Sequence, residues 1–162
     1  MGSASDLPVA EEAVKALSEF AVPYEVMVCS AHRTPEDLRT FAAGAREAGF
    51  GALICIAGLA AHLAGAAAAL TTLPVVGVPA ASGSLQGLDA LLSTAQMPPG
   101  IPVATVAIGA GRNAALLCVQ MLAIEDASLA MQLASARERM ASGIRDKNRE
   151  VASALNQKEV QG

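Results

Sequence analysis

Hydrophobic and polar residues follow one another along this chain in two kinds of block. Short runs that are apolar throughout are typical of strands buried on both faces of a parallel sheet, and an apolar residue every three or four positions is typical of a helix. The predicted strands are Tyr24–Cys29, Ala52–Ile56, Pro74–Pro79 and Val103–Ile108. The predicted helices are Leu7–Phe20, a helix opened by Thr34 and Pro35, Ala60–Leu70, Gly87–Ala95, Asn113–Ile124 and Asp126–Gln157.

This alternation of strands and helices predicts an α/β domain in which helices cover both faces of a parallel sheet. Ligands of such domains bind beyond the carboxyl ends of the strands. Four segments therefore become candidates for a site: Gly2–Asp6, Ser30–Pro35, Ala57–Gly65 and Pro79–Gly87. The first of them begins at Met1, although a doubly wound sheet would place a strand before it. We interpret this as a shortened start in which several apolar residues are absent.

The final segment predicts a long helix that extends past the domain. We divide the chain into a main α/β part, residues 1–125, and a helical extension of the same domain, residues 126–162. Apolar residues recur along the extension at helical spacing: Leu129, Leu133, Ala136, Met140, Ile144, Val151 and Leu155. Such a stripe is typical of a helix that packs on a neighbouring subunit. The alternative is a solvated terminal helix.

Composition narrows the range of partners. The chain is 53% hydrophobic with a formal net charge of -4, so it has no broad basic field for nucleic acid, and any phosphate must be held locally. Its three cysteines lack metal-ligand spacing, which predicts buried free thiols in a reducing cytoplasm. We identify no signal peptide, and the apolar stretch from Ala57 to Leu70 is too short to cross a bilayer.

The opening loop offers hydroxyl groups beside the start of a helix. Ser3, Ser5 and the helix amides suit a phosphate, although Ser5 and Asp6 could instead only cap the helix. In the second loop His32 could exchange protons near neutral pH, and the fork of Arg33 suits a phosphate or carboxylate. His62 lies among small apolar residues, where a buried structural histidine is equally well supported.

Taken together these segments resemble the aminoimidazole ribonucleotide carboxylase family, in its bacterial mutase type. The resemblance runs from Met1 to about Leu122 through MGSASD, SAHRTP, AGLAAHLAG, LPVVGVPA, LDALLSTAQMP, GIPVATVAIG and NAALL. It implies a flavodoxin-like fold of three layers, a cytoplasmic homo-octamer, no metal and no cofactor. It implies conversion of N5-carboxyaminoimidazole ribonucleotide to 4-carboxy-5-aminoimidazole ribonucleotide in purine biosynthesis, through release and recapture of carbon dioxide.

The resemblance also implies roles for single residues. His32 would be the general acid and base, and Ser3, Asp6 and Arg33 would hold the ribose phosphate with help from Ser5 and Ser30. The remaining substrate-binding residues would be Ala31, Ala57, Gly58, His62 and Leu63. This chain departs from the family in the third loop, where Ile56 and Leu59 replace glycines and Ala64 replaces a proline. At Leu59 a side chain stands where the family presents backbone to its ligand.

Three alternatives stay open on the sequence. A direct carboxylase would take aminoimidazole ribonucleotide and free carbon dioxide. A flavin-binding electron carrier would stack its ring on aromatic residues, whereas this chain has no tryptophan and one tyrosine, Tyr24. A non-catalytic assembly protein would account for the altered third loop.

Overall fold

The computed structural model describes the backbone of residues 1–159 and the side chains of residues 1–155. The chain divides into a compact unit, Met1–Leu122, and a second unit that begins at Ala123. The first unit holds a parallel sheet of three strands in the order β1 (Leu53–Ala57), β2 (Val75–Pro79) and β3 (Ala104–Thr105). Leu53 pairs with Val75 and Val76 with Ala104, so all three strands end at the same edge.

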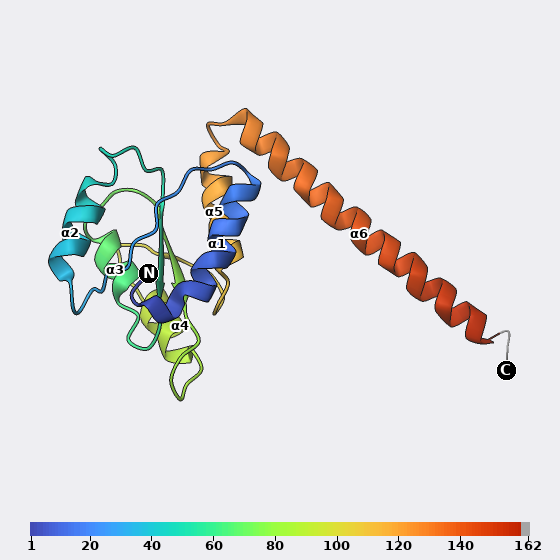
Figure 1. Ribbon diagram of the computed structural model, residues 1–162, viewed down its shortest axis with the longest axis horizontal. Coiled ribbons are helices and arrows are strands. Elements are labelled where there is room, and N and C mark those ends of the chain that lie inside the picture. The colour runs from blue at the N-terminus through green and yellow to red at the C-terminus, as the bar shows by residue number, and fades with distance from the viewer. Residues whose placement is uncertain (160–162) are drawn as a thin grey trace. The chain divides into compact units, whose positions relative to one another are not determined.

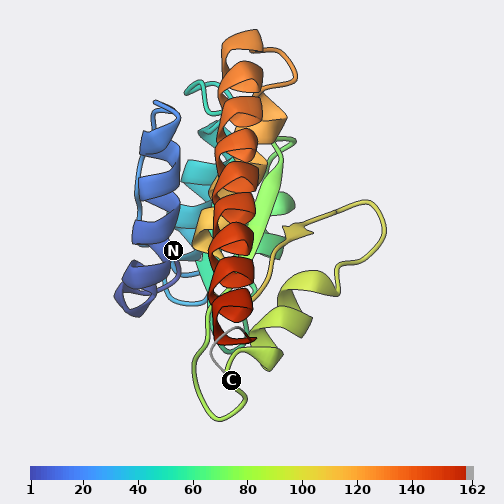
Figure 2. The ribbon, with the colours of Figure 1, turned by 90° about the vertical axis from the view of Figure 1, so that its right-hand side faces the viewer.

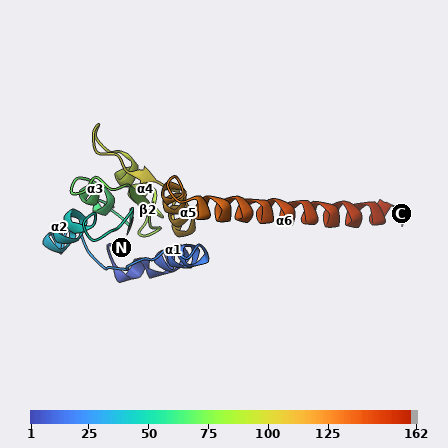
Figure 3. The same cartoon turned by 90° about the horizontal axis from the view of Figure 1, so that it is seen from above.

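Helices cover both faces of this sheet, as Figures 1 and 3 show. On one face lie α1 (Leu7–Glu19) and α5 (Gly111–Leu122), which pack against each other and against Ile56, Val76 and Val78. On the other face lie α2 (Pro35–Gly44), α3 (Leu63–Ala68) and α4 (Leu88–Ala95). Because β2 is covered on both sides, each of its residues is buried, which explains its continuous apolar run.

Small residues let the layers approach closely. Gly77 in β2 lies under α3 and α4, and a Cβ there would stand 2.3 Å from Cγ2 of Thr94 and 3.3 Å from Cβ of Ala64. Ala16, Ala42, Ala67, Ala90 and Ala115 are wholly buried. Alanine residues therefore occupy helix faces that meet the sheet or another helix, where larger side chains would keep the layers apart. The three cysteines are free and buried, and burial raises the pKa of Cys55 and Cys118 to about 12.

The second unit is formed largely by α6 (Ala127–Glu159), a single uninterrupted helix (Figure 2). Asp126 caps it by accepting hydrogen bonds from the backbone N–H groups of Ser128 and Leu129. Met140, Ile144 and Val151 are more than half exposed. The packing of this helix on a neighbouring subunit stays a prediction. None of the helices in residues 1–159 is long and apolar enough to cross a membrane.

Three elements differ from the sequence prediction, and one of them is β3, which covers only Ala104–Thr105 of the predicted strand Val103–Ile108. Tyr24–Cys29 is extended but forms no sheet strand, and Tyr24, Val26 and Val28 are about half exposed. A strand is defined by its partners, and within residues 1–159 the backbone bonds of this segment run to Met1 alone. The helix predicted from Ala60 begins at Leu63 instead, because the Ala60 carbonyl accepts from the N–H of His62 and the first helical bond runs from the N–H of Ala66 to the carbonyl of His62.

Candidate active site

The opening loop forms a single 3-10 turn, η1 (Ala4–Asp6), before α1 begins. Its backbone is held by a reciprocal cap: the backbone N–H of Ser5 donates to Oγ of Ser3, and the backbone N–H of Ser3 donates to Oδ2 of Asp6. The Ser5 hydroxyl also donates to Ser3 Oγ over 2.9 Å. Ser3 therefore caps the turn, whereas Asp6 makes no side-chain cap bond to α1, and a phosphate-binding role of this loop stays a prediction.

Asp6 is the one buried carboxylate of this loop, with 7% of its surface exposed. Burial raises its pKa, while the hydrogen bonds from Ser3, Ser5 and Gly2 and the charge of the terminal ammonium act in the opposite direction. Because the bonds are all donated to the carboxylate, they favour its charged form. These bonds hold the Asp6 side chain in one orientation, with Oδ2 accepting from the backbone N–H of Ser3 in the same loop.

The second loop is closed by its own residues. The Thr34 hydroxyl accepts from the backbone N–H of Ser30 over 2.9 Å, and the backbone N–H of Thr34 donates to the carbonyl of Ser30 over 2.9 Å. The side chain of Arg33 turns back over this turn: its Nε lies 3.4 Å from Ser30 Oγ, and its Nη2 donates to the carbonyl oxygen of Gly2 over 3.3 Å. The guanidinium therefore lies against the opening loop, and Ala31 beside it is half-buried against the core.

The third loop is fixed by contacts with residues that lie outside it in the sequence. Ser93 of α4 accepts from the backbone N–H of Ala61 over 3.0 Å and lies 3.4 Å from the carbonyl oxygen of Leu59. Gly58 lies so close to Ser82 that a Cβ on it would stand 2.3 Å from the Ser82 hydroxyl. The loop leaves β1 at Ala57, whose carbonyl accepts from Ala80. Its path therefore depends on residues that follow β2.

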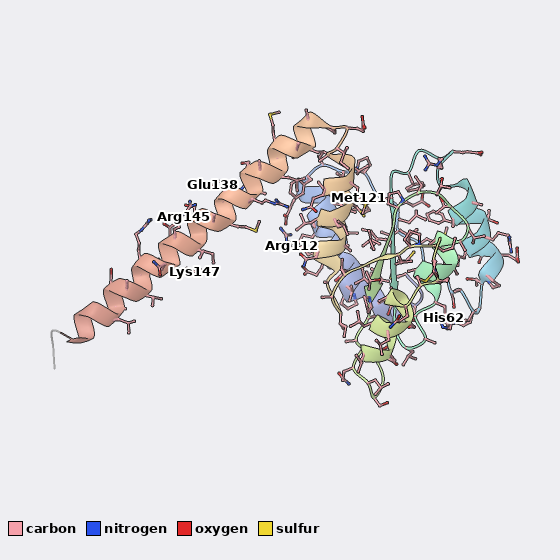
Figure 4. The ribbon with its side chains drawn as sticks, turned by 180° about the vertical axis from the view of Figure 1, so that it is seen from behind. His62, Arg112, Met121, Glu138, Arg145 and Lys147 are labelled. Atoms are coloured by element: carbon pink, nitrogen blue, oxygen red, sulfur yellow. The ribbon has the colours of Figure 1, made fainter. Side chains whose placement is uncertain are left out.

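The two histidines of the chain meet although 30 positions separate them. Nε2 of His32 lies 2.9 Å from Nδ1 of His62, with the rings 5.0 Å apart and nearly perpendicular. One of these nitrogens donates and the other accepts. Both side chains are exposed, and Figure 4 shows His62 at the start of α3. This places the two imidazole rings in direct contact.

The three loops converge on Gly2. Its carbonyl accepts from Arg33, and its N–H donates to the carbonyl of Ile56 over 2.8 Å. Ser3, Asp6, Ser30 and Arg33 thus form one polar cluster, and His32 and His62 form another. Leu63 differs from the rest because its side chain is buried in the core, so only its backbone is available to a ligand. Among the described residues no group of histidine, cysteine and carboxylate side chains could hold a metal ion.

Three features of this site carried no signal of their own in the sequence. Ser93 sits in a helix, where a serine is ordinary, and its role depends on the third loop passing beside it. The contact between His32 and His62 likewise depends on the path of two loops, which spacing along the chain does not give. The reversal of the chain at Leu59 is equally hidden, because a leucine is a rare occupant of the left-handed region.

Comparison with known proteins matches residues 1–143 to the family model described as AIR carboxylase. A protein of Pyrococcus abyssi named N5-carboxyaminoimidazole ribonucleotide mutase is 55% identical over 140 residues, 86% of this chain and 80% of that protein. Proteins of the same name from Mycobacterium tuberculosis and Thermotoga maritima are 50% and 44% identical, covering 93% and 98% of this chain and 87% and 96% of their own length.

Solved structures agree with the fold. The crystal structure of Treponema denticola PurE superposes with a TM-score of 0.80 at 30% identity, covering 90% of this chain and 91% of that chain. A variant of PurE2 from the same organism gives a TM-score of 0.83 at 28% identity over 93% of both chains. The architecture is therefore the flavodoxin-like α/β fold that the sequence predicted.

Proposed function

This chain belongs to the AIR carboxylase family, and from that premise we propose that it is an N5-carboxyaminoimidazole ribonucleotide mutase. It moves a carboxyl group from the exocyclic nitrogen of the substrate to C4 of the imidazole ring, a step of purine biosynthesis. The observation that carries the proposal is the contact between His32 and His62, beside a polar cluster suited to a phosphate, in a chain whose curated relatives bear this name.

The phosphate is proposed to bind at the cluster around Gly2. Arg33 supplies the positive charge, Ser3, Ser5 and Ser30 supply hydroxyls, and Asp6 accepts from a ribose hydroxyl. The guanidinium already bridges the second and the opening loops, so the substrate meets a preformed site rather than one it must assemble. The other proposed contacts are the backbone of Ala31, Ala57, Gly58 and Leu63, together with the ring of His62.

The proposed reaction needs one proton donated to the carbamate nitrogen and one proton removed from C4 of the ring. His32 in its charged form donates a proton to the carbamate nitrogen, the C–N bond breaks, and carbon dioxide leaves a neutral aminoimidazole. The enamine-like C4 then attacks the carbon dioxide, and neutral His32 removes the C4 proton to restore aromaticity. His32 ends as it began, so a single acid and base completes the cycle without a cofactor.

His62 is proposed to position His32. The hydrogen bond between His32 Nε2 and His62 Nδ1 fixes the orientation of the His32 ring and leaves Nδ1 of His32 to exchange the proton with the substrate. This is a role that neither histidine reveals alone. It also makes His62 part of the site, in preference to the structural histidine that the sequence left as an alternative.

Carbon dioxide must stay in the site between the two steps. The third loop supplies small apolar residues for this, from Ala57 to Ala61, and closure over the base would keep water out. Leu59 is exposed at 55% and points a large side chain out of this loop. We propose that the loop encloses the substrate with backbone and alanine methyl groups, and that Leu59 lies on its outer side.

We further propose that the protein is a cytoplasmic homo-octamer. Apolar side chains exposed in the first unit, Leu85, Leu88 and Leu92, and those along α6 support an assembly. Light scattering at micromolar concentration tests it, and a monomer would contradict it.

The decisive experiment for the activity separates the mutase from the direct carboxylase. Purified protein is given either the carbamate substrate without bicarbonate, or aminoimidazole ribonucleotide with bicarbonate, and formation of the C4-carboxylated product is followed by absorbance. We expect turnover of the carbamate in the absence of bicarbonate. Product formed only from aminoimidazole ribonucleotide and bicarbonate would show the chain to be a carboxylase instead.

A further inference from the structure

The fourth candidate segment, Pro79–Gly87, supplies no group to the proposed substrate site, yet it interlocks with the third loop. Gly58 of the third loop approaches Ser82 so closely that a Cβ on it would stand 2.3 Å from the Ser82 hydroxyl. One residue further along both segments the relation is reversed, because a Cβ on Gly83 would stand 2.7 Å from Cδ2 of Leu59. Each segment thus presents a glycine that receives a side chain of the other.

The fourth segment is a firm support for this contact. Its two ends meet, since a Cβ on Gly87 would stand 3.1 Å from both the carbonyl oxygen of Ala80 and Cα of Ala81. Within it, the carbonyl of Gly83 accepts from the side-chain amide of Gln86 over 3.0 Å. Both of these residues have a left-handed backbone, with φ of 64° and 50°. The backbone at Gly83 is therefore fixed by bonds and contacts within its own segment.

Leu59 occupies its place at a conformational cost. Its φ of 54° lies in the left-handed region, which a leucine rarely adopts and a glycine adopts freely. Because 55% of the residue is exposed, burial of its side chain offsets only part of this cost. A glycine would suit the backbone here and would lose the contact with Gly83. A strained residue in a loop of the site points to a role for its side chain.

The backbone of Leu59 leads directly to the pair of histidines. Its carbonyl oxygen lies 3.4 Å from Oγ of Ser93, and the same Oγ accepts from the N–H of Ala61 over 3.0 Å. His62 is the next residue, and its Nδ1 lies 2.9 Å from Nε2 of His32. A displacement of the Leu59 side chain from its support would therefore move the segment that carries His62.

We propose that Leu59 is a positioning residue, whose side chain, packed on Gly83, holds the third loop in the conformation that encloses the substrate. This inference rests on the function proposed above and deepens it. The loop so held retains carbon dioxide between its release from the nitrogen and its addition to C4, and it keeps His62 against His32. A chain with glycine at position 59 would lack this contact.

The effect of losing the contact follows from the order of the chemical steps. Once the C–N bond has broken, the site holds carbon dioxide and the neutral aminoimidazole, with the proton from His32 on its nitrogen. If the loop opens at this point, both molecules leave as they are, and the C4-carboxylated product is not formed. Loss of the Leu59 side chain therefore changes the fate of the carboxyl carbon. A loss of stability alone would change only the amount of active enzyme.

The test follows that carbon atom. The carbamate substrate carries a carbon-13 label in its carboxyl group, the buffer contains unlabelled bicarbonate, and mass spectrometry measures the label retained in the product, with spontaneous loss subtracted from a sample without enzyme. Leu59→Ala and Leu59→Gly should each lose about threefold more label than the unaltered chain, or more, although the two variants differ in stability. Leu59→Met, whose side chain is long enough to reach Gly83, should restore retention.

A second variant alters the same contact from the other side. Gly83→Ala places a methyl group where Leu59 packs and displaces that side chain without changing it, so this variant should lose label as Leu59→Ala does. The double variant should lose no more than either single variant, because both remove one contact. Gly49→Ala is the matched control, since Gly49 is also left-handed, with φ of 86°, and a Cβ on it would meet nothing within 4 Å. It should retain the label.

The outcomes that contradict the two proposals are distinct. Absence of product from the unaltered chain would overturn the proposed function, and the role of Leu59 with it. Product formed with equal loss of label by the unaltered chain and both Leu59 variants would overturn the role of Leu59 alone. Additive losses in the double variant would do the same. So would a change of oligomeric state in the Leu59 variants, measured by light scattering, which would assign the side chain to a contact between subunits.

Discussion

The two loops that each contribute a histidine are built in opposite ways. The loop of His32 is closed by bonds within itself, between Ser30 and Thr34 and through the start of α2. The loop of His62 has little of its own to hold it, and is fixed by Ser93 from α4 and by the approach of Gly58 to Ser82. The conformation of the first loop is therefore fixed by contacts within six consecutive residues. The conformation of the second loop is fixed by contacts with residues far away in the sequence.

This difference indicates that the two loops have different roles in the proposed reaction. A loop with local bonds keeps its shape whatever its surroundings do, which suits the group that performs the proton transfer. A loop fixed by remote contacts moves when those contacts are released, which suits a segment that encloses a substrate. Changes in the first loop should therefore act on the chemistry, and changes in the second should act on positioning and stability.

The largest effect should come from exchanging one histidine and not the other. His32→Asn keeps a similar size and a hydrogen-bond donor but cannot shuttle the proton, so kcat should fall by about a thousandfold or more while the substrate still binds. His62→Asn, the matched variant in the second loop, should keep measurable turnover. Steady-state kinetics and equilibrium binding check both. Near wild-type turnover by the His32 variant would remove it from the mechanism.

A second variant probes the polar cluster that the first loop shares with Gly2. Arg33→Lys keeps the charge but loses the guanidinium fork that reaches Ser30 and the Gly2 carbonyl, so KM should rise by about tenfold or more. Arg39→Lys, on the exposed side of α2, is the control. An unchanged KM for the Arg33 variant would place the phosphate elsewhere.

A smaller effect should follow from releasing the second loop. Ser93→Ala leaves the buried N–H of Ala61 without its acceptor, and should lower the free energy of unfolding by about 1–2 kcal/mol. Chemical denaturation measures it, with Ser18→Ala at an exposed position of α1 as the control. Equal stability of the two variants would mean that the loop does not depend on α4.

The smallest effect isolates the backbone of the second loop. Leu59 has a φ of 54°, in the region that glycine adopts without penalty. Leu59→Gly and Leu59→Ala both remove the exposed side chain, but only glycine relieves the conformation. The glycine variant should therefore be the more stable of the two by about 1 kcal/mol. The opposite order would show that the loop has another conformation in solution.

The same contrast explains how far the sequence predicts the structure. Helices with a strong period were placed within a few residues, as in α1 and α4, because their apolar faces are encoded locally. Tyr24–Cys29 has the composition of a strand but no partner beyond Met1, and pairing is not a local property. Of the predicted strand Val103–Ile108, Ala104–Thr105 pairs with Val76 and Gly77 and forms β3.

The candidate site likewise has features that the sequence predicts and features that it does not. The sequence places the loops of Arg33 and His62 after predicted parallel strands and the loop of Ser3 where a first strand would end, which predicts that the three loops lie together at one edge of the sheet. That the two histidine rings touch depends on the reversal at Leu59 and the anchor at Ser93, which involve residues far apart in the sequence. The order of the motifs thus predicts which loops lie together. The contacts between their side chains are determined by tertiary packing, which the motifs do not encode.

The contact between Gly58 and Ser82 has a consequence for the evolution of this loop. A Cβ at position 58 would overlap the hydroxyl at position 82, and that hydroxyl is buried with no hydrogen-bond partner among the described residues. Replacing Ser82 by glycine would remove the overlap without breaking a bond. The two positions are therefore expected to drift as a pair: among descendants of this chain, a side chain at 58 should arise only in lineages that have already given up the one at 82.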